Sequence, residues 1–251
     1  MKQIRTNRAL RLAAGAFLAA GTLAACDAPT AAVDRAVAGE PSLLITPACA
    51  GTGGQAHPFQ HISTAQTWTR ANSPHRVTGA INVDAGGRLT IAPGAVVCFE
   101  PGTTLTAQNG GRLYFRGRDT AQVVLTARDP SQGWGGIMVS GAPATPSYLT
   151  NVRIELVGLN ATAVTTTGQH AVYLDSAVIR RTGQAVRFTA SGSRLVRSRV
   201  DTTTNRNLPA VDLESGTRFE QSVVRGAASV GVQVYGEDVL LLGGRIEGSG
   251  G

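Results

Sequence analysis

Residues 86–91 read Gly-Gly-Arg-Leu-Thr-Ile, and residues 110–115, 24 positions later, read Gly-Gly-Arg-Leu-Tyr-Phe. Another step of 24 reaches a third apolar pair, Ile137 and Val139, with Gly135 beside it. Within each pair the apolar residues stand two positions apart, which is the period of a β-strand. A step of 24 residues indicates a chain that returns to the same place after one circuit. The pattern therefore predicts an all-β fold, a parallel β-helix (solenoid) formed by a single chain.

Short strands separated by turns continue this pattern along the chain. Residues 81–83 are matched by residues 105–107, and Pro-Gly turn signals stand at 93–94 and 101–102. After residue 150 the coils loosen, but they persist with inward apolar pairs. These later pairs are Val186 with Phe188, Val211 with Leu213, and Val232 with Val234. Coils of this length predict roughly seven turns, whose stacked inner faces form one apolar column.

The segments 89–97, Leu-Thr-Ile-Ala-Pro-Gly-Ala-Val-Val, and 134–137, Trp-Gly-Gly-Ile, carry a family resemblance. They resemble the right-handed parallel β-helix proteins of the pectin-lyase-like superfamily, particularly its bacterial surface and lipoprotein members. The resemblance implies right-handed coiling over residues 77–251. It does not imply an activity, because this scaffold hosts lyases, hydrolases, adhesins and inert spacers.

The first 25 residues have the features of a secretion signal. Four cations precede an apolar run that is too short to span a membrane, and the run ends at Leu-Ala-Ala-Cys, residues 23–26. This ending resembles the bacterial lipobox, which implies cleavage before Cys26 and lipidation of that residue. We therefore expect a protein of the bacterial cell envelope, anchored to a membrane through lipid on Cys26. Whether the inner or the outer membrane carries it, and whether it reaches the cell surface, stays open.

Composition divides the mature chain into three parts. Residues 26–48 are rich in alanine and proline and predict a flexible tether. Residues 49–76 predict an irregular N-terminal cap in which Phe59 and Trp68 pack over the end of the β-helix, which occupies residues 77–251. The cap contains three histidines, but their spacing matches no closed zinc pattern. We expect no metal and no cofactor.

Two cysteines remain if Cys26 carries lipid. In an oxidising compartment Cys49 and Cys98 could form a disulfide that ties the cap to the first coil. Alternatively, Cys98 could be a small core residue of its strand. The sequence favours neither reading.

The charge of the chain does not indicate a nucleic-acid partner. The formal net charge is +7, but once the signal is removed 19 basic side chains stand against 16 acidic ones. These charges are interleaved along the chain, whereas nucleic-acid binders gather cations on one face. We therefore expect no nucleic acid among its partners.

Catalytic or binding residues of a β-helix must lie at its outward-facing positions. We expect two outward ladders, the first of Ile179, Asp201, Arg225 and Glu247, and the second of Tyr173, Arg187, Asp212 and Gln233. Enzymes of the resembled fold use clustered acids, often with an arginine base. Arg187, Asp201 and Asp212 are the candidates for such catalysis, as a polysaccharide lyase or a glycoside hydrolase. No dense group of acids accompanies them, and His170 is expected in a turn or at the surface.

Sugar recognition needs exposed aromatic rings beside hydrogen-bonding groups. Tyr114 and Tyr173 should face outward and are the candidates, although we expect several coils between them. The sequence therefore favours a lipid-anchored β-helix with a structural, adhesive or glycan-binding role, and a cell-surface or extracellular polysaccharide as its partner. A carbohydrate-active enzyme is the alternative. Because no capping element follows residue 248, we also expect either pairing of the last coil with another molecule or an incomplete sequence.

Overall fold

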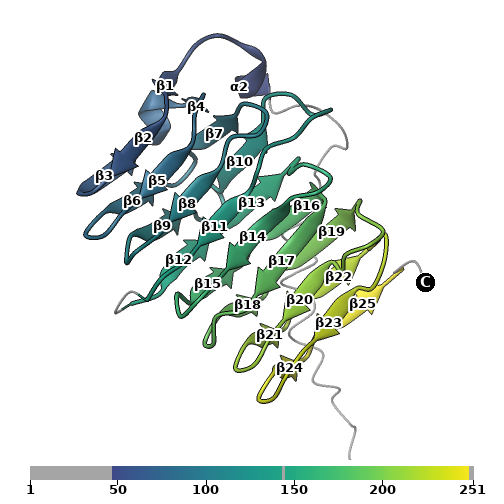
Figure 1. The fold of residues 1–251 in the computed structure, drawn as a ribbon. Coiled ribbons are helices and arrows are strands. Elements are labelled where there is room, and N and C mark those ends of the chain that lie inside the picture. Colours follow the sequence, from purple (N-terminus) through teal and green to yellow (C-terminus); the bar gives the residue numbers. More distant parts are fainter. Residues whose placement is uncertain (1–46, 143–144, 249–251) are drawn as a thin grey trace, which may run out of the picture.

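The computed structural model describes residues 47–142 and 145–248, which form a right-handed parallel β-helix (Figure 1). Its short strands stack into three parallel sheets of nine, eight and eight strands, giving about eight turns. Sheet A contains β1 (Gln55–His57), β4 (His75–Val77), β7 (Val96–Phe99), β10 (Val123–Ala127), β13 (Val152–Glu155), β16 (Val178–Thr182), β19 (Arg199–Thr203), β22 (Val223–Arg225) and β25 (Arg245–Glu247).

The other two sheets follow sheet A within each turn. Sheet B contains β2 (Gln60–Ile62), β5 (Ile81–Val83), β8 (Leu105–Ala107), β11 (Ile137–Val139), β14 (Thr162–Thr166), β17 (Gln184–Phe188), β20 (Val211–Leu213) and β23 (Val232–Val234). Sheet C contains β3 (Ala65–Trp68), β6 (Arg88–Ile91), β9 (Arg112–Arg116), β12 (Ser147–Thr150), β15 (Val172–Asp175), β18 (Arg194–Val196), β21 (Arg218–Glu220) and β24 (Leu240–Leu242).

The core is a column of apolar side chains enclosed by the three sheets. Inward positions of successive coils stand in register, because each strand pairs in parallel with its counterpart one turn away. On sheet C one such column consists of Trp68, Ile91, Phe115, Leu149, Leu174, Leu195 and Phe219. All seven are buried. Stacking of apolar side chains on the apolar side chains of the next coil removes their surface from water at every turn. This burial stabilises a solenoid that has few aromatic residues.

The chain bends on either side of sheet A at residues with positive φ. Before the strands from β13 onward, these residues are Asn151, Ser176, Arg197, Gln221 and Gly243, with φ between 46° and 58°. In the last residues of the same strands or directly after them, the residues with positive φ are Leu156, Arg181, Thr202, Gly226 and Gly248, with φ between 54° and 60°. The left-handed conformation recurs at each turn although glycine occupies it only in the last coils. The stacking of successive corners therefore holds non-glycine residues in a left-handed conformation that these residue types seldom adopt elsewhere.

The Gly-Gly pair that begins the repeat is required by the backbone. Gly110 has φ of +94°, a conformation that side chains disfavour. A Cβ on Gly111 would lie 2.0 Å from the carbonyl oxygen of Val83. The same contact recurs one coil earlier, where a Cβ on Gly87 would lie 1.9 Å from the carbonyl oxygen of Ile62. The chain therefore passes too close to the preceding coil for any side chain.

The second step of 24 residues, which leads to the third apolar pair, does not follow the coil. Ile137 and Val139 lie on sheet B, where they pair with Leu105 and Ala107. On sheet C, the residue one coil after Leu113 is Ser147, 34 positions along the chain. Longer connections on either side of β10 and β11 account for the difference. The prediction was wrong at this coil, although the fold that it indicated is confirmed.

The predicted positions of two ladder residues, Ile179 and Tyr173, were also wrong. Ile179 is buried in the core and pairs with Val200, so Arg180 is the outward residue aligned with Asp201. Tyr173 lies on sheet C, and Thr165 precedes Arg187 on sheet B. The first ladder therefore runs Glu155, Arg180, Asp201, Arg225 and Glu247, and the second runs Thr165, Arg187, Asp212 and Gln233.

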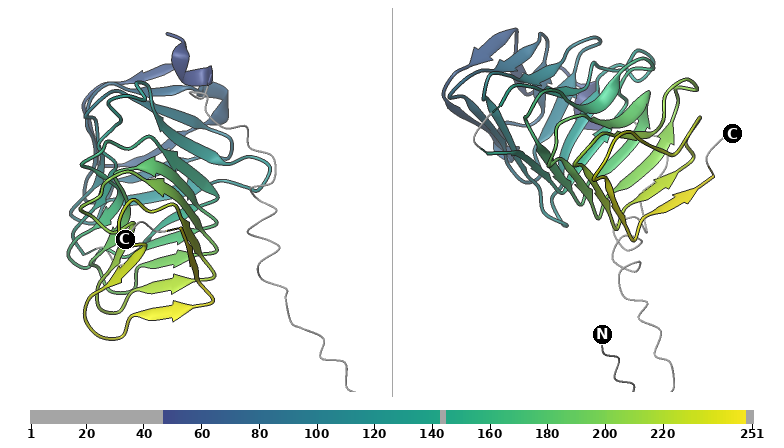
Figure 2. Two further views of the ribbon diagram at one scale, coloured as in Figure 1. Left: turned by 90° about the vertical axis from the view of Figure 1, so that its right-hand side faces the viewer. Right: turned by 60° about the horizontal axis from the view of Figure 1, so that its bottom comes forward.

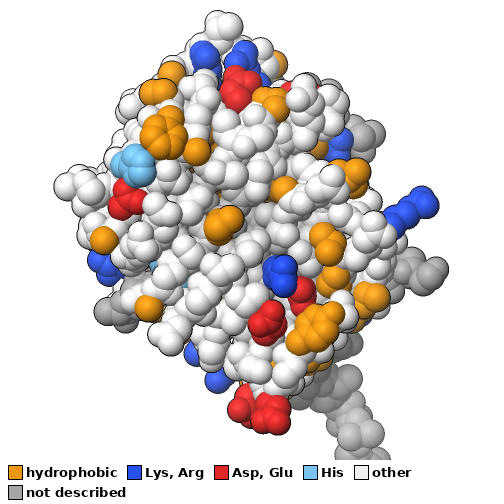
Figure 3. All heavy atoms as spheres, in the orientation of Figure 1, with side chains coloured by type: hydrophobic (Ala, Val, Ile, Leu, Met, Phe, Trp, Pro, Cys, Tyr) orange, Lys and Arg blue, Asp and Glu red, His pale blue; other side chains and the backbone are white. Residues whose placement is uncertain are grey.

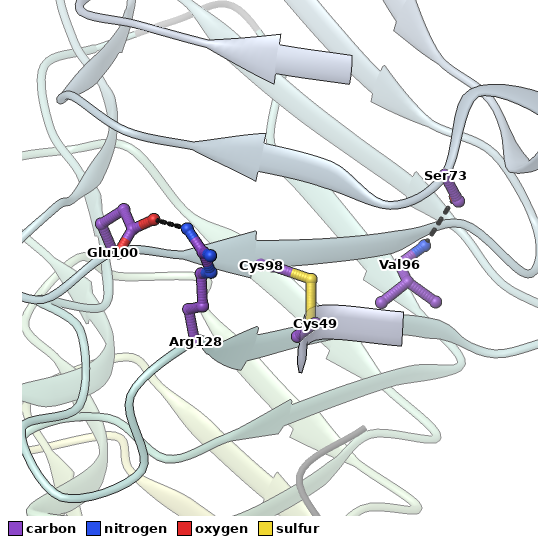
Figure 4. Close-up of a disulfide and its surroundings, with 6 residues drawn as sticks. All are labelled: Cys49, Ser73, Val96, Cys98, Glu100 and Arg128. Atoms are coloured by element: carbon purple, nitrogen blue, oxygen red, sulfur yellow. Dashed lines mark hydrogen bonds and ion pairs between the residues drawn. A yellow bond between two sulfur atoms is a disulfide. The ribbon is translucent and has the colours of Figure 1, made fainter. Parts of the chain in front are cut away.

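The N-terminal part contains a short helix, α2 (Pro47–Ala50), three strands and a 3-10 turn (Arg70–Asn72). A disulfide joins Cys49 of α2 to Cys98 of β7 (Figure 4). Cys98 alternates with the core residues Val97 and Phe99, so its side chain points outward and is covered by α2. Trp68 is buried, whereas Phe59 is 60% exposed. The prediction that Phe59 packs over the end of the β-helix was therefore wrong.

Two further views show α2 and β25 at opposite ends of the stack (Figure 2). The described residues contain no helix that is long and apolar enough to cross a membrane. Cys26 and the predicted tether lie outside the described residues, apart from the part of the tether that forms the start of α2.

Candidate functional site

Three tyrosines stand on consecutive coils of sheet C and form an outward-facing ladder. Tyr114 pairs with Tyr148, and Tyr148 pairs with Tyr173. The ring centroids of Tyr114 and Tyr148 are 5.7 Å apart, and those of Tyr148 and Tyr173 are 5.1 Å apart with the planes at 83°. Tyr148, in the middle, is 37% exposed, and the outer two are half-buried. We call these three residues the tyrosine ladder.

The alternation of β-strands explains why all three side chains point outward. Leu113 and Phe115 flank Tyr114 and are buried, and Val172 and Leu174 flank Tyr173 in the same way. A side chain between two inward residues must point away from the core. Because the register between coils is parallel and without offset, the three rings lie one above another.

Arginines border the tyrosine ladder at both ends. The guanidinium carbons of Arg88 and Arg116 each lie 5.8 Å from the ring centroid of Tyr114. That of Arg194 lies 4.8 Å from the ring centroid of Tyr173. Each of these distances is within the range of a cation–π contact, which holds the guanidinium over the negative face of the ring. The site therefore combines aromatic surface with fixed positive charge.

Tyr148 is the member that sequence reasoning missed. We expected several coils between Tyr114 and Tyr173, but only one coil lies between them, and it carries Tyr148. The available signal was the alternation in residues 147–149, Ser-Tyr-Leu, which resembles the neighbouring strands. The irregular length of this coil concealed its alignment with Tyr114.

The three catalytic candidates do not converge. Arg187 and Asp212 are neighbours on sheet B, with Arg187 Nε 3.6 Å from Asp212 Oδ2. Asp201 lies on sheet A, where its Oδ1 accepts a hydrogen bond of 2.6 Å from Nε of Arg199. The two aspartates therefore lie on different sheets.

Asp212 nevertheless has an unusual environment. Burial raises the pKa of its carboxyl group, and the charge of Glu214 adds to this, whereas Arg187 opposes it. Its Oδ1 atom is buried and accepts no hydrogen bond within the described residues. A carboxyl group in such a place is a candidate proton donor. One such group alone does not form the acid pair that glycoside hydrolysis needs.

Two of the cap histidines form a buried pair. His75 Nε2 donates to the carbonyl oxygen of Thr69 at 2.8 Å, so its Nδ1 accepts the hydrogen bond of 3.0 Å from His57 Nε2. The ring of His57 stacks on Trp68 with centroids 4.0 Å apart. Burial, and then the neighbouring His75, lower the pKa of His57 to about 4. The described residues contain no group of three metal-ligating side chains.

A serine and a histidine also meet inside the β-helix. His170 Nδ1 donates to the carbonyl oxygen of Ser140 at 3.2 Å, and its Nε2 accepts from the hydroxyl of Ser147 at 3.0 Å. The same hydroxyl oxygen accepts the N–H of Leu113. Ser147 and His170 are both fully buried, so no substrate reaches them and the contact is structural. His170 follows a turn as expected, but it is not at the surface.

Charged side chains are scattered over the face where sheet B lies in Figure 1. Figure 3 shows them in small, separated groups among polar atoms, with apolar side chains between them. No family model, curated protein or solved structure matches the chain.

Proposed function

We propose that this protein is a lipid-anchored component of the bacterial cell envelope whose β-helix binds a glycan on the tyrosine ladder. The observation that carries the proposal is the alignment of Tyr114, Tyr148 and Tyr173 on consecutive coils, with ring centroids 5.7 and 5.1 Å apart. These residues form one surface instead of isolated aromatic positions.

The chemistry of tyrosine suits such a ligand. A sugar ring presents an apolar face of C–H groups that packs against an aromatic ring, while its hydroxyl groups stay hydrated or accept hydrogen bonds. Three rings in a column repeat this contact along the axis of the solenoid, over two strand spacings of about 4.8 Å each. A repeating ligand, such as a polysaccharide, meets equivalent positions on successive coils. Arginine side chains at the ends of the ladder supply hydrogen-bond donors.

The test is binding of the purified protein to a glycan array and to isolated cell-wall polysaccharide. Tyr148→Ala removes the central ring, and Tyr114→Ala with Tyr173→Ala removes the outer two. We expect each variant to lose most of its binding. Tyr235→Ala is the matched control, because Tyr235 is 51% exposed but follows β23 of sheet B, away from the ladder. Binding that survives loss of the three ladder rings would refute the proposal.

Attachment to the membrane is the second part of the proposal. It is supported by the charged and apolar segments of residues 1–25 and by the Leu-Ala-Ala-Cys ending at Cys26. Cys26→Ser should abolish lipidation, so that the protein moves from the membrane fraction to the soluble fraction once its signal is removed. We also infer a relationship to the lipoproteins of the pectin-lyase-like superfamily, which is supported by residues 89–97 and by the right-handed coil.

A further inference from the structure

The arginines beside the tyrosine ladder differ from those elsewhere on the β-helix. Arg88, Arg112, Arg116 and Arg194 have no acidic side chain within ion-pairing distance among the described residues. We call these four residues the ladder arginines. Arg88 and Arg112 are partners in adjacent strands of sheet C, one coil apart, with Arg116 on the same strand as Arg112.

The outer face of sheet A shows the opposite arrangement. There Arg180 binds Glu155, Arg199 binds Asp201, and Arg225 and Arg245 both bind Glu247. Acids occur on sheet C as well, but the two that lie closest along its outer columns already have partners. Asp175 pairs with Arg197, and Glu220 pairs with Arg218. Positive charge on sheet A is therefore neutralised locally, whereas at the tyrosine ladder it is not.

Uncompensated arginines at adjacent positions repel one another and create a positive potential. The side chains are nevertheless held in place, because three of them lie over tyrosine rings and Nη1 of Arg112 donates to Oγ1 of Thr145 at 2.9 Å. A guanidinium group fixed in this way has donors left for a planar or tetrahedral oxyanion, which it binds by two parallel hydrogen bonds.

We propose that the ligand of the tyrosine ladder is an anionic glycan. Its sugar rings lie on the three tyrosines, and its carboxylate, phosphate or sulfate groups bind the ladder arginines, with Arg88, Arg112 and Arg116 at one end and Arg194 at the other. This inference rests on the proposed glycan-binding function and narrows it to charged sugars. Arg112 and Arg116 on β9 are three strand spacings from Arg194 on β18, or about 14 Å, so a segment of a few sugar units bridges the two ends.

The experiment compares matched pairs of oligosaccharides by titration calorimetry. One pair is a uronate oligosaccharide and its carboxyl-reduced form, and a second is a phosphorylated oligosaccharide and its dephosphorylated form. We expect at least one anionic member to bind about tenfold or more tightly than its neutral partner, because each charge-assisted contact is strong. The difference should shrink between about 50 mM and about 500 mM NaCl, since salt screens exposed charges. The pair that shows the difference identifies the anionic group.

Variants separate this inference from the proposed function. Arg116→Gln with Arg194→Gln should remove the preference for the anionic member while leaving binding of the neutral member, whereas Tyr148→Ala should weaken both. Arg206→Gln is the control, because Arg206 is exposed and lies in the connection between β19 and β20. Thermal unfolding of each variant confirms that it is folded.

Each outcome decides between the two proposals. Equal affinity for the anionic and neutral members overturns the inference but leaves glycan binding in place. Absence of binding to any member overturns both. Binding to vesicles of anionic phospholipid that is unaffected by Tyr148→Ala, without binding to the oligosaccharides, assigns the ladder arginines to a membrane surface and also overturns the inference.

Discussion

Arg180 on β16 donates a hydrogen bond of 2.8 Å from Nε to Oε2 of Glu155, one coil earlier on β13. This contact belongs to a pattern that repeats every second coil on the outer face of sheet A. Strands β13, β19 and β25 carry arginine and an acid two positions apart, at residues 153 and 155, 199 and 201, and 245 and 247. Strands β16 and β22 carry valine and arginine at the aligned positions. Each acid is thereby placed between arginines on its own strand and on its neighbours.

A slip of one residue would turn core residues outward, and a slip of two would align Arg180 with Arg153 or Arg199, so this pattern fixes the register of sheet A. The contribution of its ion pairs to stability depends on burial. Glu155 is 5% exposed at its side chain, whereas Glu247 is 39% exposed. We predict that Arg180→Gln lowers the free energy of unfolding by about 2 to 3 kcal/mol, because it weakens the pairing of a buried carboxylate.

Arg245→Gln is the matched control for this prediction, since Arg245 binds the exposed Glu247 at 2.5 Å. Exposed pairs contribute less than about 1 kcal/mol, so this variant should be close to the wild type. Urea unfolding monitored by circular dichroism measures both. Equal losses in the two variants would show that burial of Glu155 does not govern the effect.

The disulfide gives a second prediction. Cys49 and Cys98 are 49 positions apart, and their bond fixes α2 on the outer face of β7. Closing a loop of that length stabilises the folded chain by about 4 kcal/mol in the chain-entropy model. We expect Cys49→Ser with Cys98→Ser to lower the melting temperature in oxidising buffer. Addition of a reductant should lower the melting temperature of the wild type but not of the double variant.

The loss should be local to the N-terminal coils. Amide hydrogen exchange should increase around β4 and β7 in the double variant, while β17 and β20 keep their protection, because contacts in a solenoid are confined to neighbouring coils. Uniform deprotection of all the coils would contradict this expectation.

The buried histidine pair predicts a pH dependence. The pKa of His57 is lowered from 6.5 to about 4 in the folded chain, so the unfolded chain binds a proton more readily. Stability is therefore fully present above pH 6.5 and is lost as the pH falls from 6.5 to 4, by about 3 kcal/mol in total. Protonation of His75 at Nδ1 also opposes two N–H groups in the contact between His57 Nε2 and His75 Nδ1.

Fluorescence of Trp68, which stacks on both rings, reports this transition. His57→Phe should flatten the loss of stability between pH 6.5 and 4. His61→Gln is the control, because His61 is exposed and pairs with Asp84 instead of the other histidines. A wild type whose melting temperature is unchanged between pH 7 and 4 would contradict the assignment.

Residues 86–91 and 110–115 were enough to predict the fold, because two consecutive coils have nearly the same length and composition. The later apolar pairs, such as Val186 with Phe188, were also aligned correctly. Alignment failed where coil length changed. The predicted ladder aligned Ile179 with Asp201, one position out of register, because Ser176 is the left-handed corner residue equivalent to Arg197. Corner conformations occupied by Ser, Arg and Gln carry no residue signature from which that shift could be predicted.

The tyrosine ladder shows the same limit at the level of the site. Alternation alone predicted that Tyr114 and Tyr173 face outward. To predict that the two tyrosines lie close together, the register between coils must also be known. That register depends on the 34-residue step from Leu113 to Ser147, which places Tyr148 beside Tyr114. Single strands therefore show which side of the sheet a residue faces, whereas the path of the connecting segments determines which residues share a site.

Asp212 gives the last prediction. Its pKa is raised above the ordinary value of 3.8 by burial, and its Oδ1 is buried without a hydrogen-bond partner, so the ionised form is destabilised in the folded chain. The folded state therefore binds a proton more readily than the unfolded state, and the penalty is present at neutral pH and disappears as the pH falls through the raised pKa. We predict that Asp212→Asn increases stability at pH 7 by about 1 kcal/mol, and that the difference vanishes near pH 3.8. Arg187 is 53% exposed at its side chain and remains hydrated without its partner.

Asp201→Asn serves as the opposite case, because the carboxylate of Asp201 accepts a hydrogen bond from Arg199 and lies between Arg180 and Arg225. Removal of its charge leaves several arginines less compensated, so this variant should lose stability at pH 7. Melting temperatures of both variants between pH 7 and 3.5 test the pair of predictions. Destabilisation by Asp212→Asn at pH 7 would show that its carboxylate is held by contacts that outweigh the cost of burial. The same variant tests the enzymatic alternative, since a polysaccharide cleavage that depends on Asp212 would disappear while the fold becomes more stable.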